Sequence, residues 1–114
     1  MTQPIIWHNP RCSKSRETLG ILEDEGFIPA VVRYLETSPS ANEIRGTVAL
    51  LGIKASDLIR KGESIYKELG LANASEADLI EAMAAHPILI ERPVVFHNGK
   101  ASVGRPPKSV LSIL

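Results

Sequence analysis

The first 35 residues alternate a short apolar run, an amphipathic segment and a second apolar run. Residues 5–7 (Ile-Ile-Trp) predict a buried strand, and residues 13–25 predict a helix with Gly26 as its C-terminal cap. The β-branched and aromatic run over residues 30–35 predicts a second strand. A strand, a helix and a strand in this order form a unit in which the helix crosses over one face of a sheet. The pattern therefore predicts the α/β class.

The middle of the chain is predicted to be helical. Ser40 and Glu43 have the spacing of a capping box, in which each side chain accepts a hydrogen bond from the other residue's backbone N–H. The same spacing recurs at Ser75 and Asp78, and Pro87 ends the helix that follows. Helices are expected after Ser40 and over three further ranges: 55–60, 64–69 and 75–86. A helical insert would then occupy residues of about 40–87.

A hairpin and a last helix are predicted near the C-terminus. Residues 94–96 and 100–103 resemble strands, and the Asn98-Gly99 pair between them is the favoured two-residue hairpin turn. Pro106 suits the start of a helix. Three apolar side chains of this helix are expected to face inward: Val110, Leu111 and Leu114. With 114 residues, the chain has the size of one domain, residues 1–114, built on a small four-stranded mixed sheet with the insert between strands 2 and 3.

Composition and charge exclude several classes of function. The chain has 13 Lys and Arg against 13 Asp and Glu, so it lacks the net positive field that binding to nucleic acid or to an anionic membrane needs. Its single cysteine, Cys12, excludes an intrachain disulfide and a metal site built on several thiolates. The N-terminus does not resemble a secretory signal, and no apolar run is long enough to cross a bilayer. We therefore expect a cytoplasmic protein with a free thiol, no bound metal or cofactor, and no nucleic-acid or membrane partner.

Residues 8–16 (His-Asn-Pro-Arg-Cys-Ser-Lys-Ser-Arg) lie where the first strand gives way to the first helix. The first backbone N–H groups of a helix have no carbonyl partner and carry a partial positive charge. A thiol beside them has a lowered pKa, and Arg11, Lys14 and Arg16 add three cations. The pattern favours a thiolate nucleophile next to a small bound oxyanion. The alternative is that Cys12 is a small buried hydrophobic residue.

Two polar neighbours of Cys12 each allow two interpretations. Ser15 could donate a hydrogen bond to the sulfur or to an oxyanion, or it could satisfy backbone groups at the start of the helix. His8 could act as a base or an electrostatic partner for Cys12, or it could bond to backbone at the end of the strand. The sequence pattern does not separate these interpretations.

Arginine is the residue best suited to an oxyanion, because its planar guanidinium can bond two oxygens at once. Arg92 and Arg105 flank the predicted hairpin at either end, so they could face one site. Arg60 stands alone at the edge of a predicted helix, and its spacing alone favours a solvated surface residue.

Residues 8–16 resemble the active-site signature of the glutathione- and glutaredoxin-linked arsenate reductases, a branch of the thioredoxin superfamily. Three further segments resemble the same family: Tyr-Leu-Glu at 34–36, Leu-Ile-Arg-Lys at 58–61 and Gly-Arg-Pro at 104–106. Residues 86–94 (His-Pro-Ile-Leu-Ile-Glu-Arg-Pro-Val) resemble the family's His-Pro-Ile-Leu-Ile-Asn-Arg-Pro-Ile run. The resemblance spans nearly the whole chain and is to a short form, which ends soon after the last helix.

This resemblance implies a thioredoxin-like fold and the reduction of arsenate to arsenite. It makes Cys12 the nucleophile, and it makes Arg60, Arg92 and Arg105 the residues that bind arsenate and the cysteine-bound arsenic intermediates. It places His8 near the thiolate and matches Pro93 to the superfamily's cis-proline. Glutathione would act as co-substrate on the Cys12 adduct, and glutaredoxin would then remove the glutathione, because the chain has no second cysteine to resolve the adduct.

Two other functions stay open. A glutathione-dependent thiol oxidoreductase could use the same thiolate on a substrate other than arsenate. The same fold also includes non-catalytic regulators that bind RNA polymerase and sense oxidation through a Cys-x-x-Cys pair. Ser15 stands at the fourth position of that motif here, so this switch is absent.

Overall fold

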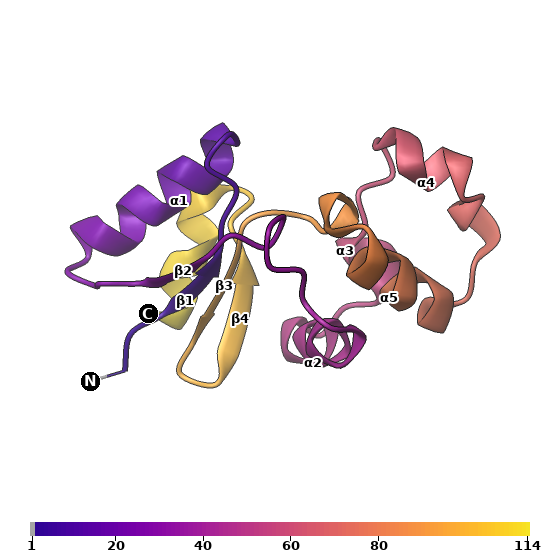
Figure 1. The fold of residues 1–114 in the computed structure, drawn as a ribbon. Helices are drawn as coiled ribbons and strands as arrows, with labels where there is room; N and C mark the ends of the chain where they lie inside the picture. The colour runs from indigo at the N-terminus through magenta and orange to yellow at the C-terminus, as the bar shows by residue number, and fades with distance from the viewer. Residues whose placement is uncertain (1) are drawn as a thin grey trace. The chain divides into compact units, whose positions relative to one another are not determined.

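The computed structural model describes residues 2–114, which divide into two compact units (Figure 1). The first unit combines the two ends of the chain, up to Thr37 and from Arg92 onward. The second unit is Ser38–Glu91, and it contains the helical insert expected at residues of about 40–87. Cys12 lies in the first unit, and Arg60 lies in the second.

A four-stranded mixed sheet forms the centre of the first unit, as predicted. Its strands lie in the order β2-β1-β3-β4, and α1 (Ser13–Asp24) connects β1 to β2. The strands are β1 (Ile5–Trp7), β2 (Ala30–Val32), β3 (Val94–His97) and β4 (Lys100–Val103). The pair β1–β2 is parallel, whereas β1–β3 and β3–β4 are antiparallel (Figure 1).

One apolar cluster holds this unit together. Ile6 and Val95 are register partners across β1 and β3, so their side chains share one face of the sheet. Leu22 of α1 and Val110 of the 3₁₀ helix η3 (Pro107–Ile113) pack against them, and all four side chains are fully buried. The cluster fixes the start of α1 at the end of β1, where Cys12 lies.

The structure corrects two sequence predictions in the first unit. The second strand ends at Val32 and not at residue 35, because Arg33 begins a turn in which its carbonyl accepts the N–H groups of residues 36 and 37. Leu111 was expected to face inward, but it is 43% exposed. A 3₁₀ helix has three residues per turn, which places Val110 and Ile113 on the buried face and turns Leu111 outward.

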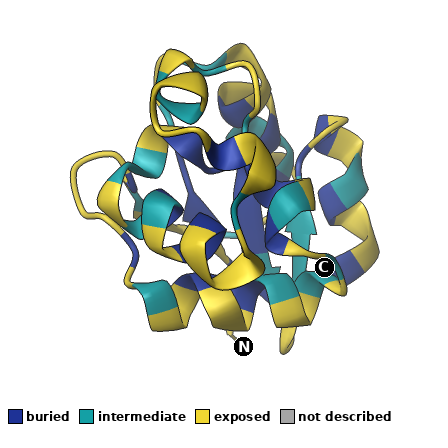
Figure 2. Ribbon diagram, turned by 90° about the vertical axis from the view of Figure 1, so that its right-hand side faces the viewer, coloured by how far each residue is buried: buried dark blue, intermediate teal, exposed yellow. Residues whose placement is uncertain are grey.

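The regular elements of the second unit are all helices, and one isolated bridge joins Ile59 to Ile90. Its elements are α2 (Ala41–Leu51), α3 (Ala55–Leu58), α4 (Ser64–Glu68), η1 (Leu71–Asn73), α5 (Glu76–Ala85) and η2 (Pro87–Leu89). The predicted capping box at Ser40 and Glu43 is present, with both reciprocal bonds made. Ser75 caps α5 through the N–H of Asp78, as predicted. The two longest helices of this unit, α2 and α5, each have a buried face and an exposed face, as amphipathic helices do (Figure 2).

Gly104 is packed too closely to accept a side chain. Its N–H donates to the Pro93 carbonyl at 2.9 Å, and a Cβ there would lie 2.5 Å from Thr18 Oγ1 and 2.8 Å from Pro93 Cγ. We expect Gly104→Ala to lower the free energy of unfolding by about 1–3 kcal/mol in urea denaturation. The matched control is Gly20→Ala in α1, where a Cβ meets no atom within 4 Å. If Gly104→Ala lowered the free energy of unfolding no more than Gly20→Ala does, a Cβ at Gly104 would not be crowded.

Candidate active site

Cys12 is the N-cap residue of α1, with an extended backbone conformation. A turn places it there, since the Cys12 N–H donates to the Asn9 carbonyl at 3.0 Å. The Cys12 carbonyl then accepts the Arg16 N–H at 3.0 Å, which is the first helical bond. The residue is partly exposed. This environment favours a reactive thiol over a buried hydrophobic residue.

Opposed effects set the pKa of the Cys12 thiol. Partial burial is the largest of them and raises the pKa, because desolvation disfavours the thiolate. The Ser15 backbone N–H, the Arg92 guanidinium and the Lys14 backbone N–H each stabilise the thiolate. Together they outweigh burial, so the pKa of Cys12 lies below its ordinary value.

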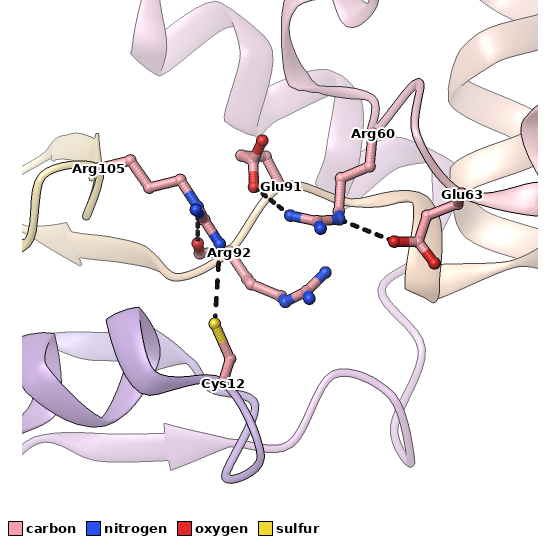
Figure 3. A network of polar contacts seen from close by, with 6 residues as sticks. All are labelled: Cys12, Arg60, Glu63, Glu91, Arg92 and Arg105. Atoms are coloured by element: carbon pink, nitrogen blue, oxygen red, sulfur yellow. Dashed lines mark hydrogen bonds and ion pairs between the residues drawn. The ribbon is translucent and has the colours of Figure 1, made fainter.

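Two arginines from the hairpin approach the sulfur. Arg105 Nη2 lies 3.7 Å from Cys12 Sγ, and Arg105 Nε donates to the Arg92 carbonyl at 2.8 Å (Figure 3). Arg92 precedes β3 and Arg105 follows β4, so the antiparallel pairing of these strands brings the two residues together. Both arginines precede cis-prolines, and the buried Pro93 has the cis bond that the family resemblance implies.

His8 and Ser15 form a buried pair at the two ends of the segment that carries Cys12. His8 Nδ1 and Ser15 Oγ are 2.7 Å apart, and Ser15 Oγ also accepts the Asn9 N–H at 3.0 Å. Burial lowers the pKa of His8, and the nearby charges of Arg33 and Arg16 lower it further. The imidazole is therefore neutral at neutral pH. The Ser15 hydroxyl thus connects the loop to the helix, while its backbone N–H faces the sulfur.

Arg60 lies between α3 and α4 of the second unit, where two carboxylates hold it. Its Nε is 3.2 Å from Glu63 Oε2, and its Nη1 is 2.7 Å from Glu91 Oε1 (Figure 3). Burial opposes the charged form, but the two glutamates outweigh it and raise the pKa of Arg60. Sequence reasoning missed both glutamates. The spacing of three residues could have indicated Glu63, whereas Glu91 comes close only through the bridge between Ile59 and Ile90.

Residues 2–114 contain neither a metal-binding cluster nor a membrane-spanning helix. No group of three or more His, Cys, Asp or Glu side chains in this part of the chain is placed to hold a metal ion. None of the helices in the same range combines the length and the apolar character that a bilayer crossing requires.

Because the pKa of Cys12 is lowered, we expect its alkylation to begin at a lower pH than that of an ordinary cysteine. Iodoacetamide reacts with the thiolate, so its rate rises as pH increases through the pKa. We expect the midpoint of this rise to lie at lower pH in the folded protein than in the same protein unfolded in urea. Mass spectrometry of the single thiol measures both profiles. Coincident midpoints would contradict the activation of Cys12.

Comparison with known proteins identifies the family. Residues 7–113 match the ArsC family. The chain belongs to this family. It is 46% identical to the arsenate reductase of Haemophilus influenzae, over 96% of this chain and 97% of the relative. It is 41% identical to the arsenate reductase of Escherichia coli K12, over 100% of this chain and 82% of the relative.

A solved structure agrees with this assignment. The arsenate reductase from Vibrio cholerae superposes with a TM-score of 0.95 at 50% identity, covering 98% of each chain. The predicted thioredoxin-like fold and the resemblance to arsenate reductases are both confirmed.

Proposed function

We propose that this ArsC-family protein reduces arsenate to arsenite through a covalent adduct on Cys12. The observation that carries the proposal is the thiol of lowered pKa at the start of α1, with the Arg105 guanidinium 3.7 Å from its sulfur. A thiolate supplies the nucleophile, and the guanidiniums of Arg92 and Arg105 neutralise an anionic substrate. The names of the relatives at 41–46% identity support arsenate as that substrate.

The proposed reaction balances with two external thiols. The Cys12 thiolate attacks arsenic, an As–S bond forms, and one arsenate oxygen leaves as water after taking up two protons. The glutathione thiol attacks arsenic, a second As–S bond forms, and a second arsenate oxygen leaves as water. Glutaredoxin then attacks the sulfur of the bound glutathione, which breaks the bond between that sulfur and arsenic. The two electrons that convert As(V) to As(III) come from these two thiols, which leave joined as a mixed disulfide. Hydrolysis of the remaining As–S bond releases arsenite and restores the Cys12 thiolate.

The other candidate residues have supporting roles in this proposal. We assign Arg60, Arg92 and Arg105 to oxyanion binding, as the family resemblance implies. His8 and Ser15 position the loop that carries Cys12 through their 2.7 Å bond. Pro93 supports the backbone beside the thiol. Because the proposed reaction consumes glutathione, we expect the protein to act in the reducing cytoplasm.

A coupled assay tests the substrate. Oxidation of NADPH is followed with arsenate, glutathione, glutaredoxin and glutathione reductase. In a parallel reaction a glutathione mixed disulfide replaces arsenate and glutaredoxin is left out, and the rate without this protein is subtracted from both reactions. We expect turnover that depends on arsenate and exceeds the turnover of the mixed disulfide. Faster turnover of the mixed disulfide, without dependence on arsenate, would favour a general thiol oxidoreductase instead.

A further inference from the structure

We propose that Glu63 and Glu91 compete with the substrate oxyanion for the guanidinium of Arg60, and that they thereby set the affinity of the protein for arsenate. This inference rests on the proposed function, in which Arg60 binds the oxyanion. It concerns two residues that the proposed reaction does not otherwise use.

The contacts around Arg60 are short and partly shielded from water. Glu91 Oε1 is 2.7 Å from Arg60 Nη1, and Glu63 Oε2 is 3.2 Å from Arg60 Nε. The three side chains are only 22%, 23% and 28% exposed for Arg60, Glu63 and Glu91. Ion pairs removed from bulk water are screened less than pairs on an open surface. An anion that needs the same N–H groups must therefore displace a carboxylate.

The backbone places Arg60 and Glu91 diagonally across one antiparallel bridge, each one residue beyond the bridged pair. The Arg60 N–H donates to the Leu89 carbonyl at 2.7 Å, and the Glu91 N–H donates to the Leu58 carbonyl at 2.9 Å. These bonds flank the bridge between Ile59 and Ile90, both of which are buried. The pairing of Arg60 with Glu91 is thus built into the fold of the second unit and is not a chance encounter of two mobile surface side chains.

The charges around Arg60 determine whether the glutamates strengthen or weaken oxyanion binding. One guanidinium faces two carboxylates, so the cluster of Arg60, Glu63 and Glu91 carries a net charge of −1 when all three are ionised. A cavity of ≈ 430 Å³ lies beside it, and Ser56, Asp57 and Lys61 also line this cavity. An oxyanion that approaches Arg60 there is attracted by the cations of Arg60 and Lys61, and it is repelled by the two glutamates and by Asp57. Removing one negative charge should therefore tighten anion binding.

The test measures arsenate binding by calorimetry in a Cys12→Ser background, so that no covalent adduct forms. We expect Glu91→Gln to lower the dissociation constant about fivefold, because the substitution removes one partly shielded charge. Glu63→Gln, which removes the longer contact, should have a smaller effect in the same direction. Arg60→Ala should weaken binding and abolish the gain from Glu91→Gln in the double variant. Glu68→Gln, at an exposed glutamate of α4, is the matched control for net charge and should change nothing.

Three results would overturn the inference. The first is a Glu91→Gln variant that folds and binds arsenate no more tightly than its parent. The second is an equal gain in the Arg60→Ala background or in Glu68→Gln, which would show that the charge does not act through Arg60. Both results leave the proposed function intact, because arsenate still binds. Failure of every variant to bind arsenate, with normal folding by circular dichroism, would overturn the inference and the proposed substrate together.

Discussion

Replacing Cys12 by serine is expected to lower kcat/KM for arsenate by about 10⁴-fold or more, as removal of a nucleophile does in other covalent enzymes. A serine hydroxyl stays protonated under the conditions that ionise the thiol, and it cannot form the As–S bond. The chain has no second cysteine that could replace the missing sulfur. The coupled NADPH assay measures the loss directly.

Matched variants separate chemistry from folding in this experiment. Cys12→Ala should lose as much activity as Cys12→Ser, since neither variant retains a sulfur. Lys14→Ala should lose far less, because Lys14 stabilises the thiolate through its backbone N–H, which alanine keeps. A folded Cys12→Ser protein that retains a tenth of the parent turnover would refute the nucleophile assignment.

Local signals made much of the first unit predictable. Asn98 and Gly99 have φ angles of 54° and 71°, a left-handed pair that asparagine and glycine tolerate better than other residues do. The hairpin therefore formed where its turn residues predicted it. Because that hairpin is antiparallel, its flanking Arg92 and Arg105 meet at one end of the sheet. An apolar run that ends at Asn9-Pro10, followed by the helical periodicity of residues 13–25, predicted Cys12 at the strand-to-helix junction.

Contacts between segments distant in the sequence were not predictable in this way. Glu91 lies 31 residues from Arg60, and only the bridge between two buried isoleucines brings it close. The outward position of Leu111 depends on the last helix having three residues per turn, which is set by how the helix packs and not by its apolar pattern. The bond between His8 and Ser15 likewise required the loop between them to fold back.

Arg105→Ala is expected to lower kcat/KM for arsenate by about 10²-fold, the range found when one preorganised donor to a developing oxyanion is removed. Arg105→Lys should recover part of this loss, because lysine keeps the charge but lacks the planar fork that bonds two oxygens. Lys108→Ala, at an exposed cation of the same segment, is the control and should retain most of the activity. Equal losses in Arg105→Ala and Lys108→Ala would mean that only the overall field attracts arsenate.

The alkylation profile then separates the roles of the two hairpin arginines. Burial raises the pKa of Cys12, and the guanidinium of Arg92 is among the groups that lower it. The contact from Arg105 Nη2 to the Cys12 sulfur is long, at 3.7 Å. Arg92→Ala should therefore move the alkylation midpoint to higher pH, and Arg105→Ala should move it less while still impairing arsenate turnover. The opposite order would make Arg105 the residue that activates the thiol. Arg105 would then serve the nucleophile more than the oxyanion, although its Nε would still hold the Arg92 carbonyl.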